Sequence, residues 1–280
     1  MESSTKRVTF THEIAAQYAQ FELHGEYRLA AHAVREKLRA HRRTTKYLVD
    51  YGCGAGKSTR AVLDCVAPGG RVTGIDISAA MLDEATRLTP PSLPAAHGLD
   101  VDYRLIQVAT GGAITVPVES GSADVVVSTQ VMQEIQAPQE LGAAFAEIGR
   151  ITKDGGHFVG VFANDEITCQ TFVSWTFAPF PENVGRTDNI RKCRSGIIPD
   201  IMWENDRHWS CDLFTASIAS AGFHILSVER PLASPDVPPN PDDPTATWRD
   251  ELLVSPFLVI AARKRSMPFA GEAAYENQRT

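Results

Sequence analysis

The amino-acid sequence predicts an α/β protein with a doubly wound, mostly parallel sheet of seven strands and with helices on both faces. Short apolar runs alternate with helical repeats between residues 45 and 162, which is typical of parallel strands joined by crossover helices. A glycine-rich turn follows the first apolar run. The last two apolar runs are joined by a proline-rich loop (231–244) with no room for a clear crossover helix, so we expect a final antiparallel hairpin.

The first 44 residues are expected to form a helical cap before the first strand. From Thr11 to about His41, apolar residues recur every three to four positions, as they do on one face of a helix. Gly25 divides this run, so two helices are predicted rather than one.

Strands and helices then alternate along the central part of the chain. Ser78 is a suitable N-cap for the helix that follows it. A helix with an apolar stripe over 141–151 is expected to be closed by Gly155 and Gly156. The predicted strands here are 47–49, 71–77, 101–108, 124–128 and 157–162, with helices over 58–65, from 79 onward and through 141–151.

Residues 163–210 interrupt this alternation and are too long for an ordinary loop. Their aromatic residues predict an inserted lid that binds the acceptor, or alternatively a small satellite core; they are Phe172, Trp175, Phe177, Phe180, Trp203 and Trp209. The sheet domain of residues 45–162 is expected to resume over 211–265, with a helix at 211–221 and strands at 223–228 and 252–262. The tail, 266–280, is expected to be disordered.

Composition and charge exclude several function classes. The net charge is −7, and no run of five basic residues is present, which argues against nucleic acid as a partner. No apolar stretch is long enough to span a membrane, and the first ten residues lack the apolar region of a signal peptide, so we expect a cytoplasmic protein. The five cysteines share no CxxC spacing and no zinc pattern with histidine, which predicts reduced thiols and no metal site.

The most informative segment is Asp50-x-Gly52-x-Gly54-x-Gly56, where a strand ends and a helix begins. Glycines at alternate positions let the backbone turn sharply and approach a ligand closely. A second acid, Asp76, ends the next strand, where a carboxylate can accept hydrogen bonds from ribose hydroxyls. A negative charge at Asp50 would repel a pyrophosphate and would favour a ligand with a cationic amino group. Together with the GxGxG spacing, this argues against a nicotinamide-dependent oxidoreductase.

This set of residues, together with the strand at 123–128 and a glycine pair before the next strand, resembles the class I S-adenosylmethionine-dependent methyltransferases that act on small molecules. The resemblance covers roughly residues 45–165 and the turn at 221–223. It implies a Rossmann-like fold, S-adenosylmethionine as cofactor and S-adenosylhomocysteine as product. It also implies that the N-terminal helices, with Tyr18, Phe21 and Tyr27, close over the cofactor.

The resemblance assigns a part of the cofactor to each motif. Asp50 is expected near the amino group, the glycines near the methionine part, Asp76 on the ribose and Ile77 against adenine. The family often carries an acid after the third strand, which is absent here; Gln107, backbone groups or apolar contacts alone are expected to hold adenine instead. The expected cofactor-binding residues are Asp50, Gly52, Cys53, Gly54, Gly56, Asp76, Ile77, Met81, Gln107, Val108, Ala109, Ser128 and Thr129.

The acceptor is expected beyond the end of the fourth strand, because ligands of open α/β sheets lie at the carboxyl ends of the strands. The candidate catalytic residues are His208, Asp165 and Gln133. The candidate substrate-binding residues are Gln130, Gln133, Trp175, Trp203 and Trp209. His208 is favoured as a base because it lies within the aromatic insert, and Glu204 and His12 are further candidates.

The sequence therefore predicts an enzyme that methylates an oxygen, nitrogen or carbon atom of a small organic molecule, in a specialised role in secondary metabolism. The alternative is an S-adenosylmethionine-binding protein without methyl transfer, such as a cyclase or a partner subunit. The sequence leaves open the acceptor, the methylated atom and the formation of a homodimer.

Overall fold

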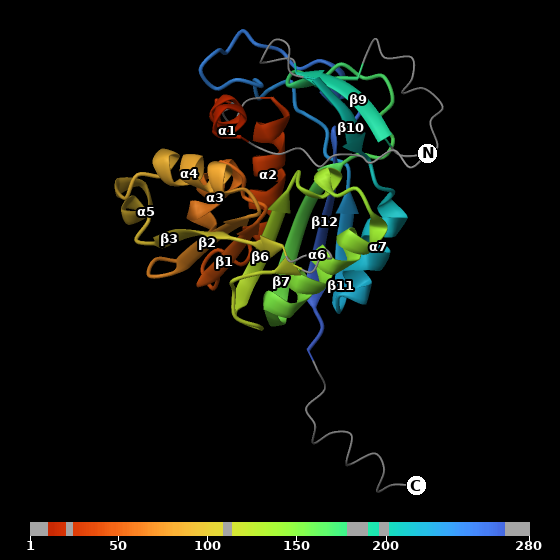
Figure 1. Cartoon of the computed structure of the whole chain (residues 1–280). Coiled ribbons are helices and arrows are strands. Elements are labelled where there is room, and N and C mark those ends of the chain that lie inside the picture. The colour runs from red at the N-terminus through yellow and green to blue at the C-terminus, as the bar shows by residue number, and fades with distance from the viewer. Residues whose placement is uncertain (1–10, 21–24, 109–113, 178–189, 196–201, 267–280) are drawn as a thin grey trace, which may run out of the picture.

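The computed structural model describes residues 11–20, 25–108, 114–177, 190–195 and 202–266. Its centre is a seven-stranded sheet with the order β11-β12-β7-β6-β1-β2-β3 (Figure 1). The strands are β1 (Tyr47–Tyr51), β2 (Arg71–Asp76), β3 (Asp100–Leu105), β6 (Ala123–Thr129), β7 (Thr152–Ala163), β11 (Phe223–Glu229) and β12 (Phe257–Lys264). Neighbours pair in parallel except β12, which is antiparallel to β7 and β11. The predicted fold class, including its final antiparallel hairpin, is confirmed.

The order of the strands reverses between β1 and β6. From β1 the chain passes outward to β2 and β3, and it then returns to β6 on the other side of β1. Open α/β sheets bind ligands at such a reversal, at the carboxyl ends of the strands. The turn that follows β1 lies at this point.

Helices cover both faces of the sheet. On one face lie α6 (Pro138–Ile151) and α7 (Cys211–Ser220), and on the other lie α2 (Glu26–Leu38) and the 3₁₀ turn η1 (Leu63–Cys65). At the carboxyl ends of the parallel strands, α1 (His12–Ala19) packs on α4 (Ala79–Leu88). Two short helices complete the set: α3 (Lys57–Ala61) follows the turn after β1, and α5 (Ser92–Ala96) precedes β3. The cap thus contains two helices with Gly25 between them, as the sequence predicts.

The prediction that Gly155 and Gly156 close a helix is wrong. Helix α6 ends at Ile151, and β7 begins at Thr152, so both glycines lie inside a strand. The Thr152 backbone is extended, with ψ 129°, and its hydroxyl donates a hydrogen bond to the Ile148 carbonyl at 2.6 Å. This side-chain bond satisfies a carbonyl of the last helical turn, so no glycine is needed to end the helix.

Two further strands differ from their predicted bounds. The third strand divides, because β3 ends at Leu105 and β4 (Gln107–Val108) pairs instead with β5 (Ile114–Thr115). The last strand begins at Phe257, because the residues before it form the 3₁₀ turn η4 (Asp250–Leu252). In this turn the buried Glu251 accepts hydrogen bonds from the backbone N–H groups of Val173 and Arg249.

After β7 the chain forms a second, smaller sheet. Strands β8 (Trp175–Thr176), β9 (Ile190–Ser195) and β10 (Met202–Arg207) pair antiparallel in the order β10-β9-β8. Figure 1 shows β9 and β10 at the same end of the main sheet as α1. No helix in the described part of the chain is long and apolar enough to cross a membrane.

Candidate functional site

A cavity of about 610 Å³ lies at the carboxyl ends of β1, β2 and β6. The predicted site residues that line it are Gly52, Cys53, Gly54, Asp76, Ile77, Met81, Val108, Thr129, Gln130, Gln133, Trp175 and His208. The predicted site residues outside its lining are Asp50, Gly56, Gln107, Ser128, Asp165 and Trp209. Ala109 and the side chain of Trp203 lie outside the described residues.

The three positions after β1 are occupied by glycine for different structural reasons. Gly52, Gly54 and Gly56 have φ angles of +74°, +51° and +75°, which favour glycine. A Cβ at Gly52 would lie 2.3 Å from the Val131 side chain, and one at Gly56 would lie 2.6 Å from the Tyr103 hydroxyl. A Cβ at Gly54 would have no atom within 4 Å. Gly54 is therefore the glycine whose backbone borders open space, whereas the other two are also required by packing.

Asp50, which is expected to face the amino group of a cofactor, is fully buried and does not line the cavity. Its Oδ2 accepts hydrogen bonds from the Ser58 and Thr59 hydroxyls at 2.7 and 2.6 Å. Its Oδ1 is buried without a hydrogen-bond partner among the described residues. Burial raises the pKa of Asp50 to about 6, although both hydroxyls oppose this shift. The carboxylate thus joins the end of β1 to the start of α3 beneath the glycine turn.

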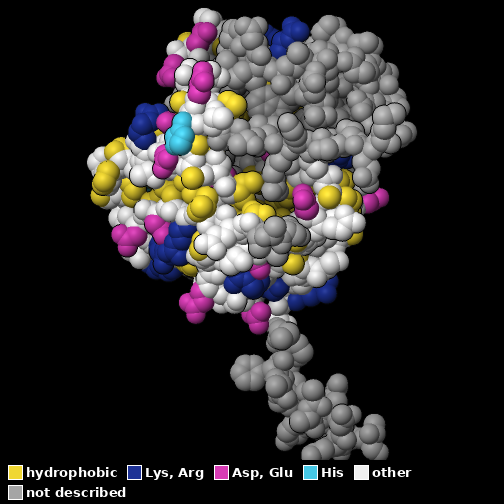
Figure 2. Space-filling view, viewed as in Figure 1, with side chains coloured by type: hydrophobic (Ala, Val, Ile, Leu, Met, Phe, Trp, Pro, Cys, Tyr) yellow, Lys and Arg dark blue, Asp and Glu magenta, His cyan; other side chains and the backbone are white. Residues whose placement is uncertain are grey.

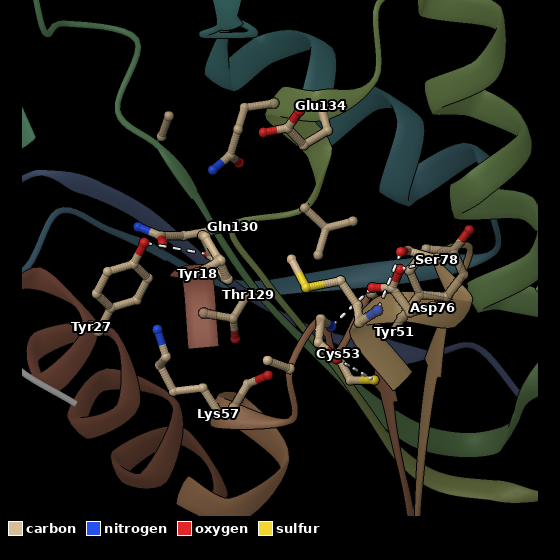
Figure 3. A pocket seen from close by; sticks show the side chains of 18 of the residues that line it. Tyr18, Tyr27, Tyr51, Cys53, Lys57, Asp76, Ser78, Thr129, Gln130 and Glu134 are labelled. Atoms are coloured by element: carbon tan, nitrogen blue, oxygen red, sulfur yellow. Dashed lines mark hydrogen bonds between the residues drawn. The ribbon is translucent and has the colours of Figure 1, made fainter. Parts of the chain in front are cut away.

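Asp76 combines a structural role with exposure to the cavity (Figure 3). Its Oδ2 accepts a hydrogen bond from the Gly54 N–H, and its Oδ1 accepts one from the Ser78 N–H, both at 2.9 Å. Burial raises the pKa of Asp76, and these backbone hydrogen bonds oppose the shift. Because a carboxylate has about four acceptor positions, Asp76 retains capacity for the hydroxyl groups of a ligand.

Beside Asp76, the cavity has an apolar wall. Ile77 and Val108 line it and are each 43% exposed, while Ile106, which also lines it, is buried. Figure 2 shows hydrophobic side chains in a band across this face of the molecule. Exposed apolar side chains at a cavity favour a flat apolar ligand group. Gln107 is exposed and lies outside the lining.

The end of β6 supplies polar groups on another side of the cavity. Thr129 and Gln130 line it, whereas Ser128 is buried behind them. Gln130 has a φ of 56°, and its N–H donates to the Val161 carbonyl at 2.8 Å. Gln133 follows in a 3₁₀ turn, and its Oε1 is buried without a hydrogen-bond partner among the described residues.

His208 is fully buried yet lines the cavity. Its Nδ1 lies 2.9 Å from the carbonyl oxygen of Asn164. A carbonyl only accepts hydrogen bonds, so this contact assigns the proton to Nδ1 and makes Nε2 the basic nitrogen of the neutral ring. Asn164 is itself fixed, because its Nδ2 donates to the Ser255 carbonyl at 2.9 Å.

Two candidate residues make structural contacts outside the cavity. Asp165, predicted to be catalytic, accepts hydrogen bonds from Arg230 and from the Cys211 N–H, both at 2.9 Å. It thereby joins the end of β7 to the start of α7. Trp209, predicted to contact the substrate, is 5% exposed within the main core, and its Nε1 donates to the Met132 carbonyl at 3.2 Å.

Lys57, the first residue of α3, was not among the predicted site residues, yet it lines the cavity and is only 7% exposed. Its Nζ lies 4.0 Å from the ring centroid of Tyr27 and 4.9 Å from that of Tyr18 (Figure 3). The sequence contained a signal for this residue. A cation at the start of a helix opposes the helix dipole, so a lysine directly after the glycine turn suggests another role.

Glu26 at the start of α2 is a second lining residue that the sequence analysis missed. It is 1% exposed, and its two oxygens accept hydrogen bonds from the N–H groups of Ser174 and Trp175 at 2.7 and 3.1 Å. Burial and, to a smaller extent, the charge of Glu251 raise the pKa of Glu26 to about 7. Among the described residues, no group of three or more His, Cys, Asp or Glu side chains is arranged to hold a metal ion.

Comparison with known proteins identifies similar sequences. Residues 49–160 match the family model described as a methyltransferase domain. A demethylmenaquinone methyltransferase from Symbiobacterium thermophilum is 30% identical over 161 residues, which are 54% of this chain and 59% of that protein. The chain covers between 20% and 59% of the length of the curated relatives that it matches.

Solved structures share the fold. A putative S-adenosylmethionine-dependent methyltransferase from Listeria monocytogenes has a TM-score of 0.55 and 19% identity, over 84% of this chain and 100% of that one. The [4+2]-cyclase SpnF has a TM-score of 0.56 and 15% identity, over 94% of this chain and 98% of that one. At these identities the likeness concerns the fold alone.

Proposed function

We propose that this chain is a class I S-adenosylmethionine-dependent methyltransferase that transfers a methyl group from S-adenosylmethionine to a small organic molecule. The match of residues 49–160 to a methyltransferase domain and the shared fold support this proposal. One observation carries this proposal. A single cavity of about 610 Å³ is lined at one part by the glycine turn and Asp76, and at another by His208 and aromatic side chains. Such a cavity can hold a cofactor and an acceptor together.

The residues present fit this cofactor. The exposed apolar surfaces of Ile77 and Val108 suit the adenine ring, and the neighbouring Asp76 carboxylate suits the ribose hydroxyls. The open space at Gly54 leaves room for a ligand against the backbone. In this proposal Asp50 acts from beneath the glycine turn, where it fixes the start of α3, and not by lining the cavity.

S-adenosylmethionine supplies a methyl group on a positively charged sulfur, so the protein mainly has to align the acceptor with it. Thr129, Gln130 and Gln133 are suitable for orienting the acceptor, since they line the cavity at the end of β6. We assign His208 as the base that removes a proton from the acceptor, because the Asn164 carbonyl fixes the basic nitrogen at Nε2. Asp165 is a positioning residue at most, since its carboxylate is engaged with Arg230 and Cys211.

The acceptor part of the cavity is apolar and aromatic. Phe172, Trp175 and Phe177 line it, and the rings of Phe172 and Phe177 pack edge-on with their centroids 6.2 Å apart. This lining supports a small, largely apolar acceptor. The net charge of −7 supports a small molecule over nucleic acid. A cytoplasmic location, a role in secondary metabolism and a homodimer remain predictions from the sequence.

The experiment is a calorimetric titration with S-adenosylmethionine and S-adenosylhomocysteine, followed by a search for labelled methyl transfer to small-molecule acceptors. The Asp76→Ala variant is expected to bind both compounds at least about 10-fold more weakly, because it loses charge-assisted hydrogen bonds. The Asp212→Ala variant, altered at an exposed acid of α7, is the control.

The outcomes separate the alternatives. Binding together with formation of S-adenosylhomocysteine on a small acceptor supports the proposal. Binding without S-adenosylhomocysteine formation for any acceptor class would favour a cofactor-binding protein without methyl transfer. Transfer to tRNA or histone and to no small molecule would contradict the proposed substrate class.

A further inference from the structure

Lys57 occupies an unusual position for a cation. It directly follows the glycine turn, begins α3 and is 7% exposed, and its ammonium group lies over the rings of both Tyr27 and Tyr18. Both tyrosines also line the cavity, and their hydroxyl oxygens are 3.4 Å apart. Figure 3 shows Lys57, Tyr18 and Tyr27 close together on the side of the glycine turn away from Asp76. We refer to these three side chains as the Lys57 cage.

The electrostatics of this position favour an anion. Burial removes much of the hydration of an ammonium group, and the faces of the two aromatic rings favour its charged form. A ligand carboxylate that enters the cavity beside this cation would gain a charge-assisted hydrogen bond.

The tyrosine hydroxyls can contribute to the same recognition. Burial, followed by the charge of Tyr18, raises the pKa of Tyr27 well above its usual value, so its hydroxyl remains protonated and can donate a hydrogen bond. Glu26, the neighbouring carboxyl in the lining, already accepts the N–H groups of Ser174 and Trp175. The cage therefore presents a cation and hydroxyl donors on the same side of the cavity.

The layout of the cavity indicates which carboxylate fits. In Figure 3, Asp76 lies on one side of Cys53 in the glycine turn and the Lys57 cage lies on the other. Gly54, which follows Cys53 and donates its N–H to Asp76, borders open space. All of these residues line the same cavity, so a ligand with its ribose at Asp76 can direct its other end toward the cage. In S-adenosylmethionine that end is an amino acid, which carries a carboxylate.

We propose that Lys57, whose ammonium group lies over the rings of Tyr18 and Tyr27, binds the carboxylate of the amino-acid end of the cofactor. This inference rests on the proposed function and adds to it a residue that distinguishes the complete cofactor from nucleosides lacking that end. A carboxylate on the acceptor is the other source of the same chemistry, and the experiment separates the two.

The test compares two ligands by calorimetry on the full chain. S-adenosylhomocysteine carries the carboxylate, whereas 5′-methylthioadenosine has the same nucleoside and thioether without the amino-acid end. In the Lys57→Met variant, affinity for S-adenosylhomocysteine is expected to fall roughly 10- to 100-fold, as for the loss of a charge-assisted hydrogen bond. Affinity for 5′-methylthioadenosine is expected to stay within about two-fold, because no carboxylate is present to lose.

Lys57→Arg is the matched variant, because it retains a cation at the same position and is expected to preserve most of the preference for S-adenosylhomocysteine. Thermal unfolding of each variant verifies that it is folded. Equal weakening of both ligands in Lys57→Met would overturn the inference, since it would mean that the lysine only shapes the glycine turn. Unchanged binding of S-adenosylhomocysteine would also overturn it and would leave the acceptor as the source of the carboxylate. If the unmodified protein binds neither compound, the proposed function fails and this inference fails with it.

Discussion

Gln130 shows how a single residue can connect backbone conformation to the site. Among the described residues it is the only one other than glycine with a positive φ, at 56°. This conformation costs roughly 1–2 kcal/mol for a residue with a Cβ. The N–H of Gln130 bonds to the Val161 carbonyl, and the residue lines the cavity. Strain of this kind is often retained where it aims a side chain at a ligand.

Substitution at Gln130 is expected to separate stability from activity. The Gln130→Gly variant should have a free energy of unfolding roughly 0.5–1 kcal/mol higher than that of Gln130→Ala. Glycine relieves the strain of the positive φ, and this gain exceeds the additional chain entropy that glycine loses on folding. Both variants should transfer methyl groups more slowly, since both lose the amide in the cavity. Urea unfolding and single-turnover rates measure the two effects. Equal stability of Gly and Ala at this position would mean that the backbone is not strained.

At the level of structural elements, two buried carboxylates fix the segment between β7 and β8. Glu26 of α2 accepts the N–H groups of Ser174 and Trp175, and Glu251 of η4 accepts that of Val173. This segment contributes Phe172 and Trp175 to the cavity wall. Its backbone N–H groups thus bond to side chains from two distant parts of the chain rather than to a regular sheet.

This arrangement predicts a specific pH dependence of stability. Burial, and then the charge of Glu251, raise the pKa of Glu26 from 4.5 to about 7, so the native state favours the protonated form. Its stabilising contribution is fully present below pH 4.5 and is lost as the pH rises through about 7. The free energy of unfolding of the wild type, relative to Glu26→Gln, should therefore fall over this window by up to a few kcal/mol, at about 1.4 kcal/mol per pKa unit.

Urea unfolding at a series of pH values measures this difference. Glu36→Gln, which removes an exposed carboxyl from the same helix, is the matched control. A rise in the wild type's relative stability with pH would contradict the predicted sign. The same trend in the Glu36→Gln comparison would show that burial of Glu26 is not the cause.

For the whole molecule, one aromatic cluster joins the helices of one face to the sheet. Phe145 of α6 is fully buried and lies 6.0 to 6.3 Å, between ring centroids, from Phe158, Phe162 and Phe214. Phe162 and Phe214 are themselves stacked at 4.1 Å. These contacts hold β7 and α7 together, and the ends of both elements border the position of His208.

Removal of the central ring is expected to destabilise the whole protein. Phe145→Ala should lower the free energy of unfolding by about 3–5 kcal/mol, because it removes buried apolar surface and leaves a cavity. Leu226→Ala on β11, where the side chain is 53% exposed, should change it by less than about 0.5 kcal/mol. Chemical unfolding measures both. A loss below about 1 kcal/mol in Phe145→Ala would mean that the core around this ring repacks.

The sequence by itself determined the fold class, because the alternation of strands and helices and the glycine turn are local patterns with few compatible topologies. Ser78 illustrates this, since its side chain caps α4 as the local sequence predicts. The sequence also predicted that Gly54, Asp76 and Ile77 line the cavity. Each of them lies at or just after the end of a predicted strand, and these strand ends meet at one edge of the sheet. The helix end at Thr152 could not be predicted, since a side-chain hydroxyl replaced the expected glycine.

Only the tertiary structure decided how the other polar side chains are used. It buried Asp50 under the turn, engaged Asp165 with Arg230, and brought Lys57 and Glu26 into the lining. The physical reason is that a charged side chain forms hydrogen bonds or ion pairs with the groups that folding brings next to it, and these groups come from distant segments of the chain. The sequence shows the charge of such a residue, whereas packing alone determines whether it faces a ligand, a backbone N–H group or another side chain.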